Sequence, residues 1–478
     1  MISSISLENY KCFENETSLN ITPLTIFCGT NSSGKTSIIK SLLTMKQTVE
    51  ANDSSFALQL SGNLVENGTF RDVVFNNDER KQFTITHSFD IEKDDNKYAS
   101  SYFRLSRIYH IPEDIMKFRI EVHVEVKKSN ATDISRFLNS NAINYYSVKV
   151  IPIDNNNCIY ENDIICISLK KHIKTPEYYL SWSNVPQLFS TKKKMNNYEN
   201  YACLCSFNGL SITSIASRKR IVLSVRSVFN NIMEILQIAT IQYKSIFFIA
   251  PLRQNPERTY LLKHNVKNVG IAGENTPIIL AQIKNKKTPN IYPYLEVVSE
   301  TVKYEDVINY WLNRFGIAAF NLQNKNGSVS LKIGKQNISD VGFGVSQVLP
   351  IITQSILMKR GETLLIEQPE IHLHPKMALE MADFLISQAQ NKINMIIETH
   401  SDHIVNRIIR RVMENQELKS LITIYFVGKD IDNTHYCKKI EIDKYNGTEE
   451  LEDFFTQYAS EIEKINEVGL DNMLGEKR

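Results

Sequence analysis

The sequence predicts an α/β protein whose sheet core is assembled from two distant parts of the chain. A short apolar segment at residues 24–28 is followed by a glycine-containing turn and a helical pattern. Two further apolar runs, at 363–366 and 394–397, have the length of buried parallel strands. Between these parts, residues 76–244 alternate between strand-like segments and polar turns. This middle segment also holds a helical piece, so it is expected to be a β-rich and helical insertion.

Length and composition indicate a globular protein of several domains. A chain of 478 residues is too long for one ordinary core. Its 55 basic and 53 acidic side chains nearly cancel, so any nucleic-acid contact must be a local patch. The seven cysteines are scattered without paired C-x-x-C spacing and are expected to be reduced thiols. No apolar run approaches the roughly 18 residues of a membrane span, which predicts a soluble, cytoplasmic protein without a membrane partner.

The turn after the first apolar segment has the spacing G-x-x-x-x-G-K-[ST] between Gly29 and Thr36. Glycines at these positions allow successive backbone N–H groups to turn inward around a polyphosphate, and the following helix adds its N-terminal donors. Lys35 is expected to reach the β- and γ-phosphates, and the Thr36 hydroxyl to ligate Mg²⁺. The residues expected to surround the nucleotide here are Gly29, Asn31, Ser32, Ser33, Gly34, Lys35, Thr36 and Ser37.

The region around this loop resembles a known family. A strand, the residues N-Y-K-C-F at 9–13, a second strand, P-L-T at 23–25 and the loop itself follow in the order found in ABC ATPases of the RecF, SMC and Rad50 type. The resemblance includes relatives of the overcoming-lysogenization-defect group. It implies ATP and Mg²⁺ as cofactors and a bipartite ABC-type P-loop NTPase core with a large insertion. The predicted divisions are an N-terminal ATPase lobe 1–75, the insertion 76–244, a C-terminal ATPase lobe 245–445 and a last helix 446–478.

The resemblance also suggests a second Mg²⁺ contact. Residues 58–64 and the turn at 66–69 suggest a hairpin. ABC ATPases place a Mg²⁺-contacting glutamine on a strand in this region, which makes Gln59 the candidate. An ordinary exposed strand glutamine is the alternative.

Basic residues are clustered in the insertion and just after it. The runs are Lys192 to Lys194, Arg218 to Arg220 and Lys284 to Lys287. They are candidates for contacts with nucleic-acid phosphates, with solvated faces as the alternative, since no aromatic interleaving accompanies them. Further on, an apolar strand at 246–250 leads into A-P-L-R and P-x-R. Its Arg253 and Arg258 suit either a nucleotide or partner contact or a structural ion pair.

Two strand ends in the second half resemble the remaining parts of an ABC site. The run 363–366 ends at Glu367, as a Walker B strand does, and Glu367 is expected to hold Mg²⁺ through its waters. The next residues, Ile371 to Pro375, resemble the loop that links paired sites; a metal site of Glu370, His372 and His374 is the alternative. His400 ends the later strand, and the resemblance makes it the switch histidine that senses the γ-phosphate.

Gln368 departs from the ABC pattern. The usual residue after the Walker B acid is a glutamate that polarises the attacking water, and an amide cannot accept that proton. Either Glu370 or His400 then activates the water, or ATP serves mainly as an assembly clamp. The sequence therefore predicts a weak ATPase.

The segment from Asp340 to Pro350 occupies the place of the ABC signature loop. Such a loop caps a nucleotide bound by a partner subunit, using a serine hydroxyl, glycine N–H groups and a helix N-terminus. Because the segment departs from L-S-G-G-Q, only Gly344 and Ser346 are carried over. The expected active unit is a homodimer or higher homo-oligomer with composite sites.

The C-terminal part suggests no further enzyme. Asp430 and Asp432 form D-x-D, but the roughly fifty residues after the core are too few for a Toprim nuclease, so the pair is expected to lie in a turn. An apolar face from Leu451 to Ile465 predicts the last helix.

Three functions remain open from the sequence. The first is an oligomeric ATPase that controls a separate effector in bacterial antiviral defence, as the resemblance to PARIS and Septu ATPase subunits implies. The second is a RecF-like or SMC-like ATPase that binds DNA, and the third is a scaffold that holds ATP without hydrolysing it.

Overall fold

The computed structural model describes most of the chain. The described residues are 1–51, 57–93, 99–109, 115–129, 141–172, 177–186, 195–216, 223–262, 266–288, 302–325, 327–430, 432 and 434–442. The predicted last helix lies outside them, as do the basic runs at 192–194 and 218–220.

A six-stranded sheet forms the centre of the molecule, with the strand order β11-β18-β19-β3-β20-β21. The first five strands are parallel, and β21 pairs antiparallel with β20. The strand bounds are β3 Leu24–Gly29, β11 Ile246–Ile249, β18 Thr363–Glu367, β19 Asn394–Glu398, β20 Ile422–Lys429 and β21 His435–Ile440. Segments more than 300 residues apart thus share one sheet, as expected for a core built from two parts of the chain.

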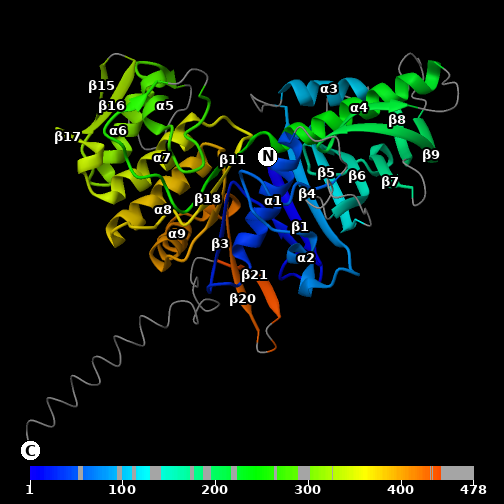
Figure 1. The fold of residues 1–478 in the computed structure, drawn as a ribbon, viewed down its shortest axis with the longest axis horizontal. Coiled ribbons are helices and arrows are strands. Elements are labelled where there is room, and N and C mark those ends of the chain that lie inside the picture. Colours follow the sequence, from blue (N-terminus) through cyan, green and yellow to red (C-terminus); the bar gives the residue numbers. More distant parts are fainter. Residues whose placement is uncertain are drawn as a thin grey trace, which may run out of the picture.

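A nine-stranded antiparallel sheet stands beside this centre (Figure 1). Its order is β10-β9-β8-β7-β6-β5-β4-β1-β2, so the inserted strands continue the sheet of β1 and β2 rather than forming a separate body. The bounds are β1 Ile2–Glu8, β2 Thr17–Asn20, β4 Phe83–Glu92, β5 Ile115–Lys128, β6 Asn141–Asp154, β7 Ile165–Lys171, β8 Tyr178–Pro186, β9 Met195–Asn208 and β10 Ser211–Ala216. In β5, buried residues alternate with partly exposed ones, as in a sheet packed on one face only.

Helices cover both faces of the central sheet. On one side, α1 packs against the central sheet while α3 and α4 pack against the nine-stranded sheet, and on the other side lie α5 to α9 (Figure 1). Consecutive residues of β3 point to opposite layers, since Phe27 belongs to one apolar cluster and Ile26 and Cys28 to the other. The helices are α1 Lys35–Glu50, α2 Phe70–Val73, α3 Ala99–Tyr109, α4 Leu223–Tyr243, α5 Thr276–Ile283, α6 Tyr304–Arg314, α7 Phe343–Leu357, α8 Pro375–Gln390 and α9 Asp402–Glu414.

Short elements complete the described chain. They are β12 Tyr260–Leu261, β13 Lys287–Thr288, β14 Val302–Lys303, β15 Phe320–Lys325, β16 Ser328–Ile333, β17 Gln336–Asn337, and the 3₁₀ turns Phe75–Asn77, Glu161–Asp163, Ile338–Asp340 and Gln416–Ser420. The hairpin suggested at 58–69 is reduced to a turn with one antiparallel bridge between Ser61 and Glu66, flanked by hydrogen bonds from the Gly62 N–H to the Val65 carbonyl (3.0 Å) and from the Asn67 N–H to the Leu60 carbonyl (2.9 Å). Among the described helices, none is both long and apolar enough to cross a membrane.

Candidate nucleotide-binding site

The loop between β3 and α1 has the backbone geometry that its glycines predicted. Gly29 has φ 134°, and a side chain there would meet the Val427 carbonyl oxygen of β20 at 2.0 Å. Gly34 has φ 111°, and a Cβ would meet the Cys12 sulfur at 2.4 Å. Ser32 also takes a left-handed conformation, with φ 57°. The loop therefore needs glycine at both ends for steric reasons as well as for its turn.

Lys35 lies inside the loop and is 2% exposed. Its Nζ donates to the carbonyl oxygens of Gly29 (3.0 Å) and Thr30 (2.5 Å) and to Ser33 Oγ (3.3 Å). Burial lowers the pKa of Lys35, while nearby Glu398 opposes this effect. The ammonium group is thus held in the cradle by backbone oxygens that phosphate oxygens are able to replace.

Two carboxylates face the start of α1 from adjacent strand ends. Glu367 ends β18 and Glu398 ends β19, and the two residues are partners in the sheet register. The Thr36 hydroxyl donates to Glu398 Oε1 at 2.8 Å. Burial and the neighbouring Glu398 raise the pKa of Glu367 to about 7, and burial also raises the pKa of Glu398. The strand order explains this arrangement, because β19 stands between the loop strand and β18.

Glu370 and His400 meet at the same edge. Glu370 Oε1 accepts the His400 backbone N–H at 2.8 Å, so this carboxylate holds the turn after β19. Burial raises the pKa of Glu370. Burial and nearby Lys35 lower the pKa of His400, which favours its neutral form. The structure therefore brings together Lys35, Thr36, Glu367, Glu370 and His400, as the sequence predicted.

The backbone after β18 is strained and firmly held. Gln368 has φ 47° and His372 has φ 59°, conformations uncommon for residues other than glycine. The Gln368 N–H donates to the Glu398 carbonyl at 2.8 Å. Arg253, 6% exposed, donates to the carbonyls of Glu367 (3.1 Å) and Gln368 (3.2 Å).

Arg253 is buried and joins two segments of the fold, whereas Arg258 forms an ion pair on the surface. Besides the two carbonyls, Arg253 Nη1 donates to Gln347 Oε1 of α7 at 3.3 Å, so it joins the signature segment to the end of β18. Arg258 pairs with Asp340 at 2.7 Å on the surface. Of the two alternatives for these arginines, the contacts within the described residues favour the structural ion pair or hydrogen bond over a free nucleotide contact.

The signature residues start α7. Gly342 is the N-cap and Gly344 lies in the first turn, where a Cβ would meet nothing closer than 3.6 Å. Ser346 is 7% exposed and its hydroxyl donates to the Phe343 carbonyl at 2.7 Å, so this hydroxyl is turned into its own helix. The Phe343 side chain is 60% exposed beside it.

Gln59 does not reach the site. Its backbone N–H donates to Thr48 Oγ1 at 2.9 Å, and its side chain donates to the Ser61 carbonyl at 2.8 Å. Thr48 lies twelve residues after Thr36 on α1, which corresponds to about 18 Å along a helix axis. The expectation that Gln59 contacts Mg²⁺ is therefore wrong for this structure, because Gln59 lies beside the later turns of α1 rather than at the loop.

His374 and the aspartates of the D-x-D sequence have local structural roles. His374 caps α8 by accepting the Lys376 N–H at 3.3 Å, and among the described residues no group of three or more His, Cys, Asp or Glu is arranged to hold a metal ion. These findings favour the loop over the metal site as the interpretation of 370–374. Asp430 Oδ1 accepts the N–H groups of Asp432 and Thr434, as a turn residue does.

Sequence reasoning missed Glu398 and His435. Nδ1 of His435 lies 2.6 Å from the Ser33 carbonyl oxygen, so β21 contacts the loop. Glu398 follows the apolar run of β19 as Glu367 follows that of β18, and this parallel was the signal that could have identified it. His435 had no such signal, since only the pairing of β21 with β20 brings it near.

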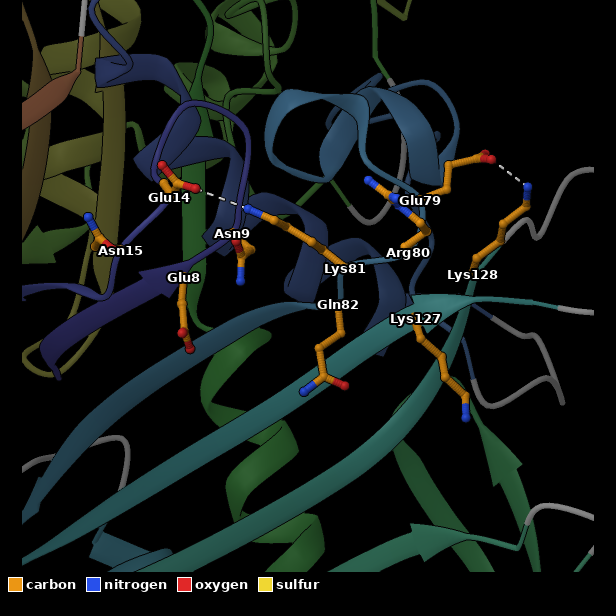
Figure 2. Close-up of a pocket in the computed structure, with 10 residues that line it drawn as sticks. All are labelled: Glu8, Asn9, Glu14, Asn15, Glu79, Arg80, Lys81, Gln82, Lys127 and Lys128. Carbon is orange, nitrogen blue, oxygen red and sulfur yellow. Dashed lines mark hydrogen bonds and ion pairs between the residues drawn. The ribbon is translucent and has the colours of Figure 1, made fainter. Parts of the chain in front are cut away.

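One of two surface hollows adjoins the loop, and the other lies away from it. A pocket of about 400 Å³ adjoins it and is lined by Lys11, Cys12, Asp72, Asn77, Ser32, Gly34, Thr36 and Ser37 among others. A larger hollow of about 720 Å³ lies over β1, β4 and β5 and includes no loop residue (Figure 2). There Lys81 pairs with Glu14 and Lys128 with Glu79. Of these two hollows, the smaller one shares residues with the loop.

The fold and this edge define a P-loop NTPase. Residues 1–405 match the family described as AAA ATPase domain. The chain belongs to this ATPase family.

Solved structures show looser similarity. An SMC head bound to the C-terminal winged-helix domain of ScpA is 13% identical, with a TM-score of 0.44, covering 93% of this chain and 98% of that one. An SMC head with an extended coiled coil, bound to the C-terminal domain of ScpA and derived from Pyrococcus furiosus, is 12% identical (TM-score 0.40; 97% and 99% covered). The SMC head of Thermotoga maritima is 10% identical (TM-score 0.34; 92% and 99%). No curated protein matches the chain.

Proposed function

We propose that this protein binds ATP with Mg²⁺ at the carboxyl edge of the central sheet and hydrolyses it slowly. The observation that carries the proposal is the convergence of four separate segments. The loop after β3, the ends of β18 and β19, and the turn at Glu370 bring a lysine, a hydroxyl and three carboxylates to one edge. In open α/β sheets, ligands bind at this edge.

The residues present fit a Mg²⁺ ion. Thr36 offers a hydroxyl oxygen and Glu367 a carboxylate, and Mg²⁺ is commonly held by one or two such groups together with substrate phosphates. Bound there, the ion would neutralise phosphate charge. Gly29, Asn31, Ser32, Ser33, Gly34 and Ser37 supply loop donors, and Lys35 reaches the phosphates once it exchanges its carbonyl partners.

Water activation falls to Glu370, with His400 beside it. Gln368 has no basic group, and its strained backbone is fixed by Arg253 and Glu398. Glu370 has a pKa raised by burial, which makes it a better proton acceptor than an exposed glutamate. Its other task, holding the His400 backbone, limits its movement and is consistent with slow turnover.

The proposed active unit is a head-to-tail homodimer or larger homo-oligomer. In it, Gly344 and Ser346 cap the nucleotide of a partner subunit. Two large apolar side chains near the end of β18 are exposed, Phe343 by 60% and Leu252 by 74%. Phe343 lies against His372 in the turn after β18, and Leu252 precedes Arg253, which donates to the Glu367 carbonyl. Exposed apolar side chains at this place support a subunit contact. For Ser346 to contribute its hydroxyl, that hydroxyl must leave the Phe343 carbonyl.

The proposed biological role is based on the absence of a glutamate at position 368, which predicts slow hydrolysis. A slow ATPase is suited to hold a nucleotide-dependent assembly that gates a separate effector, such as a nuclease or toxin, in bacterial antiviral defence. The resemblance of the motifs to PARIS and Septu ATPase subunits supports this role. A RecF-like or SMC-like DNA-binding ATPase and a non-hydrolysing ATP scaffold are the competing roles.

One set of measurements separates these roles. Phosphate release and molar mass by light scattering, with and without MgATP, are expected to show slow turnover and ATP-dependent assembly. Salt-sensitive binding of DNA that depends on the nucleotide would favour the DNA-binding role instead. Tight ATP retention with no phosphate release, even with a partner and trigger present, would favour the scaffold.

A further inference from the structure

Glu398 is the buried acid that the proposed ATPase mechanism leaves without a task. Only 3% of Glu398 is exposed, and it stands at the end of β19. Its Oε1 accepts the Thr36 hydroxyl at 2.8 Å. Its Oε2 is buried and has no hydrogen-bond partner in the part of the chain that the structure describes. A buried carboxylate oxygen without a donor is costly, so this atom calls for a ligand.

The surroundings specify a cation. Glu367 is the register partner of Glu398 on β18, and neighbouring strands are about 4.8 Å apart. Among the described residues, neither carboxylate forms an ion pair; Lys35 donates to loop oxygens and Arg253 to backbone carbonyls. Lys35 and Lys40 lie near Glu398, but neither forms an ion pair with it in the described part of the chain. Two adjacent acids beside a hydroxyl match the oxygen ligands preferred by Mg²⁺.

We propose that Glu398 completes the divalent-cation site of the nucleotide pocket, in the role that the family resemblance assigned to Gln59. Glu398 Oε1 continues to accept the hydrogen bond from the Thr36 hydroxyl. The lone pairs of that hydroxyl oxygen are therefore free to bind the cation. Oε2 receives the cation or one of its waters. This inference rests on the proposed ATPase function and deepens it by identifying a positioning carboxylate.

The test measures nucleotide affinity with and without metal. The dissociation constant of the non-hydrolysable analogue AMP-PNP is determined by calorimetry in Mg²⁺ and in EDTA, and their ratio defines the metal gain. Glu398→Gln keeps the shape and an acceptor for Thr36 but removes the charge. It is expected to lower the metal gain about tenfold or more, while AMP-PNP affinity in EDTA stays equal or increases because a negative charge near the phosphates is lost.

The matched control is Glu362→Gln. Glu362 is also buried, 6% exposed, but precedes β18 at the opposite end of the strand. It is expected to leave the metal gain unchanged. Thr36→Val, an isosteric change, is expected to lower the metal gain in the same way as Glu398→Gln and gives a second route to the answer.

Several results would overturn the inference. A wild-type metal gain in Glu398→Gln, or in Thr36→Val, would show that this pair is not the cation site. A parallel loss of affinity in both buffers, together with a lower melting temperature in EDTA, would show that Glu398 is structural. Failure of the wild-type protein to bind AMP-PNP in either buffer would instead refute the proposed ATPase function, and this inference with it.

Discussion

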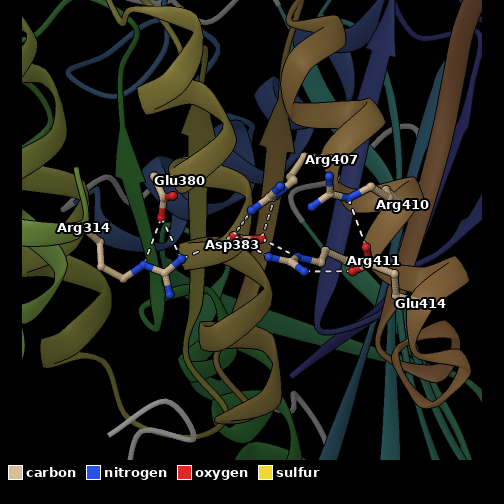
Figure 3. Close-up of polar contacts among 7 residues, drawn as sticks. All are labelled: Arg314, Glu380, Asp383, Arg407, Arg410, Arg411 and Glu414. Carbon is tan, nitrogen blue, oxygen red and sulfur yellow. Dashed lines mark hydrogen bonds and ion pairs between the residues drawn. The ribbon is translucent and has the colours of Figure 1, made fainter. Parts of the chain in front are cut away.

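Two groups of acids on opposite sides of the central sheet differ in whether arginine side chains neutralise their charge. Asp383 of α8, 4% exposed, receives two hydrogen bonds each from Arg407 and Arg411 of α9 (Figure 3). Arg314 of α6 bridges it to Glu380. Glu367 and Glu398 at the nucleotide edge form no ion pair among the described residues.

The pKa values follow this difference. Burial would raise the pKa of Asp383, but the hydrogen bonds from Arg411 and Arg407 outweigh it and hold the pKa below its usual value. At the nucleotide edge, burial and mutual repulsion raise the pKa of Glu367 to about 7. The arginines therefore neutralise Asp383 within the fold. The negative charge of Glu367 and Glu398, by contrast, is arranged to be neutralised by a bound cation.

The largest expected effect on stability is at Asp383. Asp383→Asn leaves two arginines around a neutral side chain and is expected to lower the free energy of unfolding by about 3–5 kcal/mol, measured by urea denaturation. Glu414→Gln is the control, because Glu414 pairs with Arg410 and Arg411 at the surface. It is expected to cost less than about 1 kcal/mol. Equal small losses in both variants would remove the distinction between the two acid groups.

Glu370→Gln is expected to slow hydrolysis about 10²-fold, measured as single-turnover phosphate release, because the amide cannot accept a proton. The amide oxygen still accepts the His400 N–H, so folding and AMP-PNP affinity are expected to change little. Unchanged hydrolysis would eliminate Glu370 as the base.

Acid should destabilise the arginine cluster specifically. A carboxyl whose pKa is lowered by folding contributes stability that is present above its unfolded pKa and is lost as the pH falls through the folded pKa. Asp383 is such a group, so wild-type stability is expected to fall with decreasing pH below the ordinary aspartate range, near 3.8. In Asp383→Asn, urea midpoints should change less over this pH range; an identical pH profile would assign the acid sensitivity elsewhere.

The smallest effect has the opposite sign. Glu367→Gln removes one of two neighbouring negative charges and is expected to stabilise the nucleotide-free protein in EDTA at pH 8 by about 1 kcal/mol. The comparison variant is Glu362→Gln, because Glu362 lies at the opposite end of β18. Destabilisation by Glu367→Gln comparable to that of Asp383→Asn would mean that both acid groups are structural.

The sequence predicted the parts of the site that local patterns encode. The loop at Gly29–Thr36 and the strand ending at Glu367 carry their own spacing and periodicity, and both were located correctly. The pairing of β4 with β1, which merges the insertion with the N-terminal sheet, depends on non-local contacts that no local pattern specifies. Gln59 was misplaced for a related reason, since the resemblance assigned it a contact at the loop, whereas the fold places it beside Thr48 in the later part of α1.

The contacts of Glu398 and His435 show the same limit. Thr36 and Glu398 are 362 residues apart, and their hydrogen bond exists because β19 was inserted next to β3 in the sheet order. His435 reaches Ser33 only through the pairing of β21 with β20 and of β20 with β3. Such contacts are set by the strand order of the sheet, and the strand order cannot be predicted from the local pattern of a single sequence.

The central claim is that Glu367 and Glu398, which form no ion pair among the described residues, and Lys35 belong to one MgATP site. Its most direct test is calorimetric titration of AMP-PNP, in Mg²⁺, into the wild-type protein and into Lys35→Ala, with thermal unfolding to verify that the variant folds. Binding by the wild-type protein and a loss of at least about hundredfold in folded Lys35→Ala are predicted. Equal affinity of the two proteins, or no binding by either, would contradict the account.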